Sequence, residues 1–389
     1  MTFRRQIFTT VIAVLLILVA VWFYSKLIRQ NMEMDLSLGA GTGVSSGMID
    51  ALKGRTLVWT TNANVPLKIE WGGEGVDILR MIGVPESMQP TDISVSRSAV
   101  RDEFNIALMK IGSEGETSEV KYLTENDGSW HKPEISAFAD YIVATRVVGD
   151  EQDIYIFDLP GGGNKPVAYS HSIDRWPSIK EDGRKILFHS YRDGSPYGDL
   201  FLASRENTDS DEWSVVKVFE EEGEEILWPM LDASGVFYVL VAWEPLSDNG
   251  FVQRHRFGSD PVDDENGAAE FRIESEGQFG IEPAEVKFPS LSRGRTVYCW
   301  NEKVEGKWQV NAYGENENGY IGPGADHPGY GWVQPCVSPD GRFVVFIDDN
   351  IGPGTDRIGI YDLELDEVLY IAGCGGNVMF PSISDQPQN

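Results

Sequence analysis

A repeated unit constrains the fold of this chain more than any other feature. Each copy begins with a proline and then passes through a turn into short apolar strands. The prolines that begin the copies are Pro90, Pro133, Pro177, Pro229, Pro289, Pro335 and Pro381. They are 43 to 60 residues apart. A period of about 40–50 residues with four short strands per unit is typical of a β-propeller, in which each unit forms one blade.

The most regular copy spans residues 334–363. Its Ser338-Pro339-Asp340-Gly341 segment predicts a tight turn, because proline fixes φ at the first turn position and glycine relaxes the last one. Residues 343–347 are an apolar run with the length of a buried strand. Residues 358–363 alternate apolar and polar side chains, as a half-buried strand does. One such sheet needs neighbours to bury its faces, and the other copies supply them.

The two ends of the repeat region complement each other. The last copy has only a first strand, residues 381–384, whereas residues 54–89 hold strands without a first strand. We therefore expect the C-terminal strand to pair with the N-terminal blade and close the ring, which removes an open sheet edge. This arrangement predicts an all-β, seven-bladed propeller over residues 54–389. Six blades are the alternative, because the copy at Pro90 shows only three clear strands.

Composition agrees with a propeller fold, and the net charge excludes one class of partner. Aromatic residues make up 11% of the chain, and it has 41 glycines and 20 prolines, which favours a turn-rich β protein. The formal net charge is −29. The first thirty residues carry four basic residues and no acid, so residues 31–389 carry −33. A domain this acidic repels phosphate backbones, so we expect no nucleic-acid partner.

The N-terminal residues predict a membrane anchor. Residues 7–24 contain no charged side chain, and at 1.5 Å per residue a helix of this length covers about 27 Å, enough to cross a bilayer. Trp22, Phe23 and Tyr24 lie where interfacial aromatics occur. No cleavage site of the small-residue type follows, so an uncleaved signal anchor over 1–30 is favoured over a cleaved signal peptide. We expect a flexible linker over 31–53 and a propeller outside the cytoplasm, periplasmic or extracellular.

Motifs that would indicate a catalytic or metal site are weak. Residues 43–47 match the GxSxG pattern of hydrolases, but Ser45 lies in the small-residue linker without the strand-turn-helix context of a nucleophile elbow. The chain has five histidines without metal-ligand spacing, and three cysteines without a CxxC pair. Buried free thiols are favoured over a disulfide. We therefore predict no catalytic residue, no metal site and no cofactor.

The segments 176–194 (WPSIKEDGRKILFHSYRDG) and 338–346 (SPDGRFVVF) resemble the TolB-like propeller repeat, also called the PD40 repeat. WD40 repeats are a poorer match, because the chain has no Gly-His or Trp-Asp dipeptide. The resemblance covers residues 54–384 as a repeat pattern. It implies a role as an exported interaction scaffold, since members of that family act in this way in the periplasm. The extra N-terminal domain of TolB has no counterpart here.

The loops that enter the innermost strands are the candidate binding site, because in a propeller they surround one mouth of the central channel. The residues two before each repeat proline are Met88, His131, Arg175, Leu227, Lys287, Val333 and Met379. His131, Arg175 and Lys287, with Lys132 beside His131, predict a mouth that accepts an anionic group of a peptide or sugar acid. The alternative is that these cations pair with neighbouring acids. The aromatics Trp176, Trp228, Phe288 and Phe380 precede the prolines and are expected to pack between blades.

Two functions follow from these predictions. The first is a membrane-anchored, exported propeller that acts without catalysis as a scaffold for protein contacts or as a ligand-binding module. The second is a propeller enzyme of the polysaccharide lyase or hydrolase type that uses residues at the channel mouth. The expected partner is a protein or a small anionic ligand. Runs of acids such as 220–222 with 224–225, and 263–265, are expected to be solvated, with a basic partner as the alternative.

Overall fold

The structure is a computed structural model of the chain, and it describes 45–63, 69–70, 93–95, 100–111, 120–124, 127–208, 210–220, 225–231, 236–242, 249–257, 262–263, 269–270, 273–292, 297–304, 307–314, 332–348, 357–372 and 377–386. The predicted membrane span, Pro90 and Cys374 lie outside these residues. No helix within them is long and apolar enough to cross a membrane.

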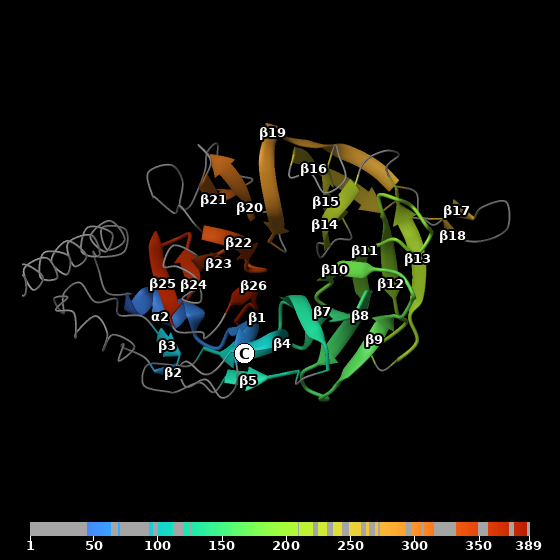
Figure 1. Cartoon of the computed structure of the whole chain (residues 1–389). Helices are drawn as coiled ribbons and strands as arrows, with labels where there is room; N and C mark the ends of the chain where they lie inside the picture. Colours follow the sequence, from blue (N-terminus) through green and yellow to red (C-terminus); the bar gives the residue numbers. More distant parts are fainter. Residues whose placement is uncertain are drawn as a thin grey trace, which may run out of the picture. The chain divides into compact units, whose positions relative to one another are not determined.

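The described strands form five sheets of four to six strands, together with one short hairpin (Figure 1). The first sheet contains, in spatial order, β26 (Val378–Ile383), β1 (Thr56–Ala63), β4 (Val100–Lys110) and β5 (Val120–Tyr122). The second contains β6 (Ser129–Ile135), β7 (Tyr141–Val148), β8 (Glu151–Asp158) and β9 (Asn164–Ala168). The third contains β10 (Asp174–Ile179), β11 (Lys185–Ser190), β12 (Asp199–Ser204) and β13 (Ser214–Phe219).

The remaining sheets have six strands each. The fourth contains β14 (Glu225–Leu231), β15 (Val236–Ala242), β16 (Asn249–Phe257), β19 (Ile273–Leu291), β20 (Val297–Val304) and β21 (Lys307–Gly314). The fifth contains β22 (Trp332–Val337), β23 (Phe343–Asp348), β24 (Arg357–Asp362), β25 (Glu367–Ala372), β3 (Ile93–Val95) and β2 (Ile69–Glu70). The hairpin joins β17 (Val262–Asp263) to β18 (Ala269–Glu270). The propeller fold is thus confirmed.

The predicted blade count is wrong, because the described strands form five blade sheets and neither seven nor the alternative six. Two repeat units, those at Pro229 and Pro289, share the long strand β19, which pairs with β16 and with β20. Within the described residues, the copy at Pro90 forms no sheet of its own. Its strands β4 and β5 complete the N-terminal sheet, and β3 pairs in parallel with β25. A repeat period counts prolines, but it does not record which sheet each strand joins.

Six strands share one local irregularity, and these are the innermost strands of the propeller: β6, β10, β14, β19, β22 and β26. In each, the pairing with the next strand shifts register next to the repeat proline, which marks a β-bulge. The residue before each proline has a φ between 46° and 55°. These residues are Lys132, Trp176, Trp228, Phe288, Gln334 and Phe380. Each innermost strand contacts the next one, and β26 contacts β6, so the six strands form a closed ring.

Hydrogen bonds join neighbouring innermost strands. The residue after the proline uses its side chain to accept an N–H from the following strand. The bonds are Ile179 N to Glu134 Oε1 at 3.0 Å, Leu231 N to Ser178 Oγ at 3.0 Å, Val337 N to Ser290 Oγ at 3.0 Å, and Ile135 N to Ser382 Oγ at 3.3 Å. These bonds give the recurring Pro-Ser pair a structural role, because the serine hydroxyl accepts a hydrogen bond from a backbone N–H of the following strand.

The predicted closure by the C-terminal strand is confirmed. β26 pairs antiparallel with β1, and Ser384 N donates to Thr56 O at 2.9 Å. Ser384 Oγ accepts from Thr56 N at 2.9 Å, just as Ser338 Oγ accepts from Phe343 N at 2.9 Å within one blade. Ser384 and Thr56, which lie far apart in the sequence, therefore form the same hydrogen bonds that Ser338 and Phe343 form across a continuous turn.

Arg55 reinforces this closure. Its side chain is 3% exposed, and it donates to Ser384 O at 3.0 Å and to Ala51 O at 2.9 Å. It also forms an ion pair with Asp340, in the Ser-Pro-Asp-Gly turn. One guanidinium thus joins the N-terminal segment, the C-terminal strand and a neighbouring sheet.

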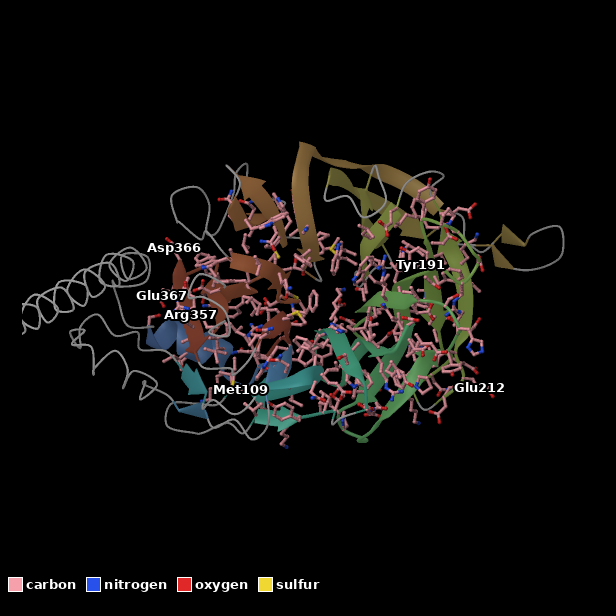
Figure 2. The ribbon with its side chains drawn as sticks, in the orientation of Figure 1. Met109, Tyr191, Glu212, Arg357, Asp366 and Glu367 are labelled. Carbon is pink, nitrogen blue, oxygen red and sulfur yellow. The ribbon has the colours of Figure 1, made fainter. Side chains whose placement is uncertain are left out.

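The last part of the expected linker is helical. Ser45 caps helix α2 (Ser46–Leu52) by accepting from Met48 N at 3.2 Å, so the GxSxG match is a helix N-cap. Met48 and Leu52 are fully buried in the core cluster that includes β1, β4 and β23 to β25. Ser45 N donates to Glu367 Oε2 at 3.1 Å, and Glu367 is labelled in Figure 2.

Candidate functional site

Four aromatic side chains meet at one mouth of the central channel, and we call them the aromatic plug: Trp176, Trp228, Phe288 and Phe380. Trp176 stacks on Trp228 with ring centroids 4.6 Å apart, and Phe288 lies edge-on to Trp228 at 4.7 Å. Phe380 lies 5.9 Å from Phe288 and 6.2 Å from Trp228. The expected packing between neighbouring innermost strands is therefore present.

The plug also spans the channel. Trp228 belongs to β14 and Phe380 to β26, and two innermost strands separate them in either direction around the ring. Their contact therefore crosses the channel from one side to the other. All four rings are half-buried, so each keeps part of its surface open to solvent. The sequence placed these side chains between blades but did not show that they meet across the mouth.

The backbone of the plug is strained. A bulky residue with positive φ is an outlier that costs about 1–3 kcal/mol, and such residues persist where the surrounding structure holds them. All four plug residues are in this region, with φ of 50–55°. Each precedes a proline, which fixes the next φ and removes a backbone donor at the bulge. The strain directs the aromatic side chains toward one another at the mouth.

Two small cavities lie along the channel wall. One, of about 50 Å³, is lined by the plug residues Trp228, Phe288 and Phe380 together with Lys132, Glu134 and Gln334. The other, of about 80 Å³, is lined by residues further along the innermost strands, among them Ser178 and Cys336. Since a water molecule needs roughly 10–15 Å³ measured in this way, each cavity holds only a few water molecules.

A polar network adjoins the plug at Arg175. Its guanidinium stacks on the Trp176 ring at 3.7 Å from the centroid. It donates to Glu225 Oε1 at 3.0 Å and to Tyr191 Oη at 2.7 Å, and Tyr191 Oη also donates to Glu225 Oε1 at 2.8 Å. Glu225 is 1% exposed. Burial raises the pKa of Tyr191 to about 12, so the phenol stays a donor. Figure 2 labels Tyr191, just after β11.

His189 also belongs to this network, through its hydrogen bond from Arg175. Its ring is fully buried, Nδ1 accepts from Arg175 Nε at 3.4 Å, and Nε2 donates to Tyr197 O at 3.3 Å. These bonds require the neutral imidazole. Burial, and then the neighbouring Arg175 charge, lower the pKa of His189 to about 3.

The pKa of His189 predicts a pH dependence of stability. The unfolded histidine binds a proton near pH 6.5, whereas the native one resists protonation until about pH 3, so stability falls as the pH drops between these values. We expect a loss of about 2 kcal/mol between pH 7 and pH 5 from this group, and a shallower loss in His189→Gln. Urea unfolding of both proteins at pH 7 and at pH 5 measures the free energy of unfolding. Equal pH slopes in the two proteins would contradict this assignment.

Gly198 gives a second prediction, because it leaves space for the His189 ring. Its φ is +72°, and a Cβ built there would lie 2.1 Å from His189 Nε2. Gly198→Ala is expected to cost about 3 kcal/mol through overpacking and backbone strain together. Gly149→Ala is the matched control, since Gly149 has φ +61° with no atom near the added Cβ. It should cost only about 1 kcal/mol. Similar melting temperatures for Gly198→Ala and Gly149→Ala would show that crowding of the His189 ring adds nothing to the cost of the substitution.

The predicted cationic residues are placed as follows. Arg175 pairs with Glu225, and Lys132 Nζ lies 3.5 Å from Glu134 Oε2 and donates to Pro177 O at 3.0 Å. Lys287 lies over the Trp308 ring at 4.9 Å from the centroid. His131 lies against the Phe104 ring, and burial lowers its pKa. The anion-accepting mouth stays a prediction, and two of its four residues are next to carboxylates.

Sequence reasoning missed the acid that neutralises Arg175. Glu225 ends a run of acids that was expected to be solvated, yet it is the first residue of β14 and is buried. Its place four residues before Pro229, at the start of an innermost strand, is the signal that distinguishes it from its exposed neighbour Glu220. Within the described part of the chain, no three His, Cys, Asp or Glu side chains are arranged to hold a metal ion. Cys299 and Cys336 are free thiols.

Comparisons with known proteins bear on the fold. No protein-family model matches the chain. No curated protein matches it either. TolB from Acinetobacter baumannii is similar in structure, with a TM-score of 0.54 at 13% identity over 86% of this chain and 67% of that one. A putative TolB from Agrobacterium tumefaciens has a TM-score of 0.47 at 13% identity over 69% of this chain and 94% of that one. The chain therefore has a β-propeller fold similar to that of TolB.

Proposed function

We propose that this protein is a membrane-anchored, exported propeller that binds a protein partner at the aromatic plug and performs no catalysis itself. The observation that carries the proposal is the plug. Four strained aromatic residues cover the channel mouth and keep part of each ring exposed. Aromatic side chains are enriched at the centres of protein interfaces, where they bury a large apolar area at low entropic cost.

The plug also weighs against the enzyme hypothesis. A lyase or hydrolase that uses the channel mouth needs a cleft for a sugar chain, and small-molecule sites are typically 300–1,000 Å³. Here, ring contacts that cross the channel occupy this position. A small anionic ligand would need cations with charge to spare, whereas Arg175 and Lys132 each lie beside a carboxylate. These contacts favour a protein partner over both alternatives.

The anchor and the location outside the cytoplasm rest on the sequence of residues 1–30. The uncharged segment 7–24 supports them. Protease treatment of intact and permeabilised cells tests this part separately. Degradation of the propeller only after permeabilisation of the inner membrane would contradict export.

The binding function is tested by cross-linking in native membranes. Full-length protein with a photoactivatable residue at Tyr191, near the plug, is compared with the same protein carrying Trp228→Ala. The matched control is Trp213→Ala, which removes a half-buried aromatic next to strand β13, away from the mouth. We expect cross-linked partners in the parent and in the Trp213 control, and their loss in the Trp228 variant. The same partners in all three proteins would refute the role of the plug, provided that all three melt cooperatively.

A further inference from the structure

Two large apolar side chains are exposed on one face of the propeller. Tyr169 is 66% exposed and Val148 is 48% exposed. Val148 ends β7 and Tyr169 lies in the loop between β9 and β10. Because sequential antiparallel strands alternate in direction, the end of β7, the end of β9 and the start of β10 lie at the same face. The plug residue Trp176 belongs to the first half of β10, so Tyr169 and Val148 share its face of the propeller.

Hydrogen bonds connect this loop to β8 and to the start of β10. Ser170 N donates to Asp153 Oδ1 at 3.3 Å, and Ser170 Oγ donates to Asp174 Oδ2 at 3.1 Å. Asp174 is fully buried and directly precedes Arg175, which stacks on Trp176. The loop is therefore fixed to the start of β10, and its Tyr169 is exposed on the same face as the plug.

The charged side chains on this face are dominated by acids. Among the described residues of the sheets β6–β9 and β10–β13, basic side chains on this face are paired: Arg146 with Asp127, Arg192 with Asp174, Arg175 with Glu225, and Lys217 with Asp193, Asp199 and Glu220. Exposed acids remain beside them, among them Asp150 and Glu151 next to Val148. The pairing of Glu151 with His171 Nδ1, at 3.7 Å, involves a histidine that is charged only when protonated. On the side of the plug formed by these two sheets, the named acids therefore outnumber the bases.

We propose that the partner segment is basic and carries an apolar or aromatic side chain, which docks on the plug while its Lys or Arg residues lie over the sheets β6–β9 and β10–β13. This rests on the proposed function and specifies its partner. An apolar centre with a polar rim is the usual anatomy of a protein interface. The net charge of −33 over residues 31–389 attracts such a segment and accelerates its association.

Three peptides test the proposal with the full-length protein in detergent, using empty micelles as a blank. Each peptide has a central tryptophan, flanked on both sides by two lysines, two serines or two glutamates. We expect the lysine peptide to bind at least about tenfold more tightly than the serine peptide, the glutamate peptide to bind most weakly, and the preference to shrink at 0.5 M salt.

Matched charge reversals localise the effect. Asp150→Lys with Glu151→Lys should weaken lysine-peptide binding about tenfold. Glu206→Lys with Glu212→Lys changes the net charge equally on the loop between β12 and β13, at the opposite face, and should leave binding unchanged; Figure 2 labels Glu212. Equal weakening by both pairs would overturn the proposed site.

The peptides also separate this inference from the proposed function. If all three bind equally and Trp228→Ala abolishes binding, the plug binds a partner but the basic class is wrong. If the lysine peptide binds preferentially and Trp228→Ala has no effect, the acidic rim acts without the plug, which refutes the docking arrangement. If none of the three binds at millimolar concentration, the proposed partner class is refuted.

Discussion

Ending the chain at Val378 is expected to lower the free energy of unfolding by more than about 5 kcal/mol and to remove the cooperative transition. The deletion takes away most of β26, and with it the strand partner of β1. It exposes the buried faces of Leu57 and Trp59 and removes Ile383, each of which is at most 1% exposed. Burying a side chain of this size contributes about 1.5–3 kcal/mol. Arg55 also loses its acceptor at Ser384.

Two comparisons make this result specific. A chain that ends at Gln386 keeps every described contact of β26 and should unfold like the full-length protein. Ser384→Ala and Ser338→Ala should each cost about 1 kcal/mol, because each removes one hydrogen bond from a backbone N–H. Ser384 Oγ accepts from Thr56 N, and Ser338 Oγ accepts from Phe343 N. Circular dichroism during thermal unfolding measures the midpoint and the cooperativity of the transition for all of these proteins. Wild-type midpoint and cooperativity after truncation at Val378 would show that β26 does not close the ring.

Replacing Arg175 with methionine is expected to lower the free energy of unfolding by about 3 kcal/mol. The change removes the ion-pair partner of the buried Glu225 carboxylate, which keeps its hydrogen bond from Tyr191. Removing one member of a buried ion pair is costly because the remaining charge is uncompensated. The change also removes the cation that stacks on Trp176.

The double variant Arg175→Met with Glu225→Gln supplies the control. It removes both charges, so it should be more stable than Arg175→Met alone. Denaturant unfolding of the two single variants and the double variant gives the coupling energy directly. Additive effects would show that the two residues do not act as a pair.

Much of the fold can be predicted from the sequence because its signals are local. The Ser-Pro-Asp-Gly turn and the apolar run at 343–347 specify a hairpin through residues close in the chain. The closure could also be predicted, since the unpaired first strand at 381–384 and the strands after residue 54 had to complete each other. The blade count could not. It depends on β19 continuing from one unit into the next, which is a long-range pairing without a signature in the period.

The candidate site shows the same division. The positions of Trp176, Trp228, Phe288 and Phe380 before the prolines are visible in the sequence, and so is the cation Arg175. Their strained backbone is less visible, because aromatic residues rarely adopt positive φ and propensity argues against it. The partner of Arg175 was not visible, because Glu225 lies fifty residues away within a run of similar acids.

Residue order and composition alone specify that this chain repeats a β unit, pairs its C-terminal strand with the N-terminal blade and carries a strong negative charge. The meeting of four aromatic rings across the channel mouth, and the neutralisation of Arg175 beside them, became visible only in the folded protein. These contacts join strands from different repeats. Distances between such strands are set by the packing of the whole ring rather than by any one segment.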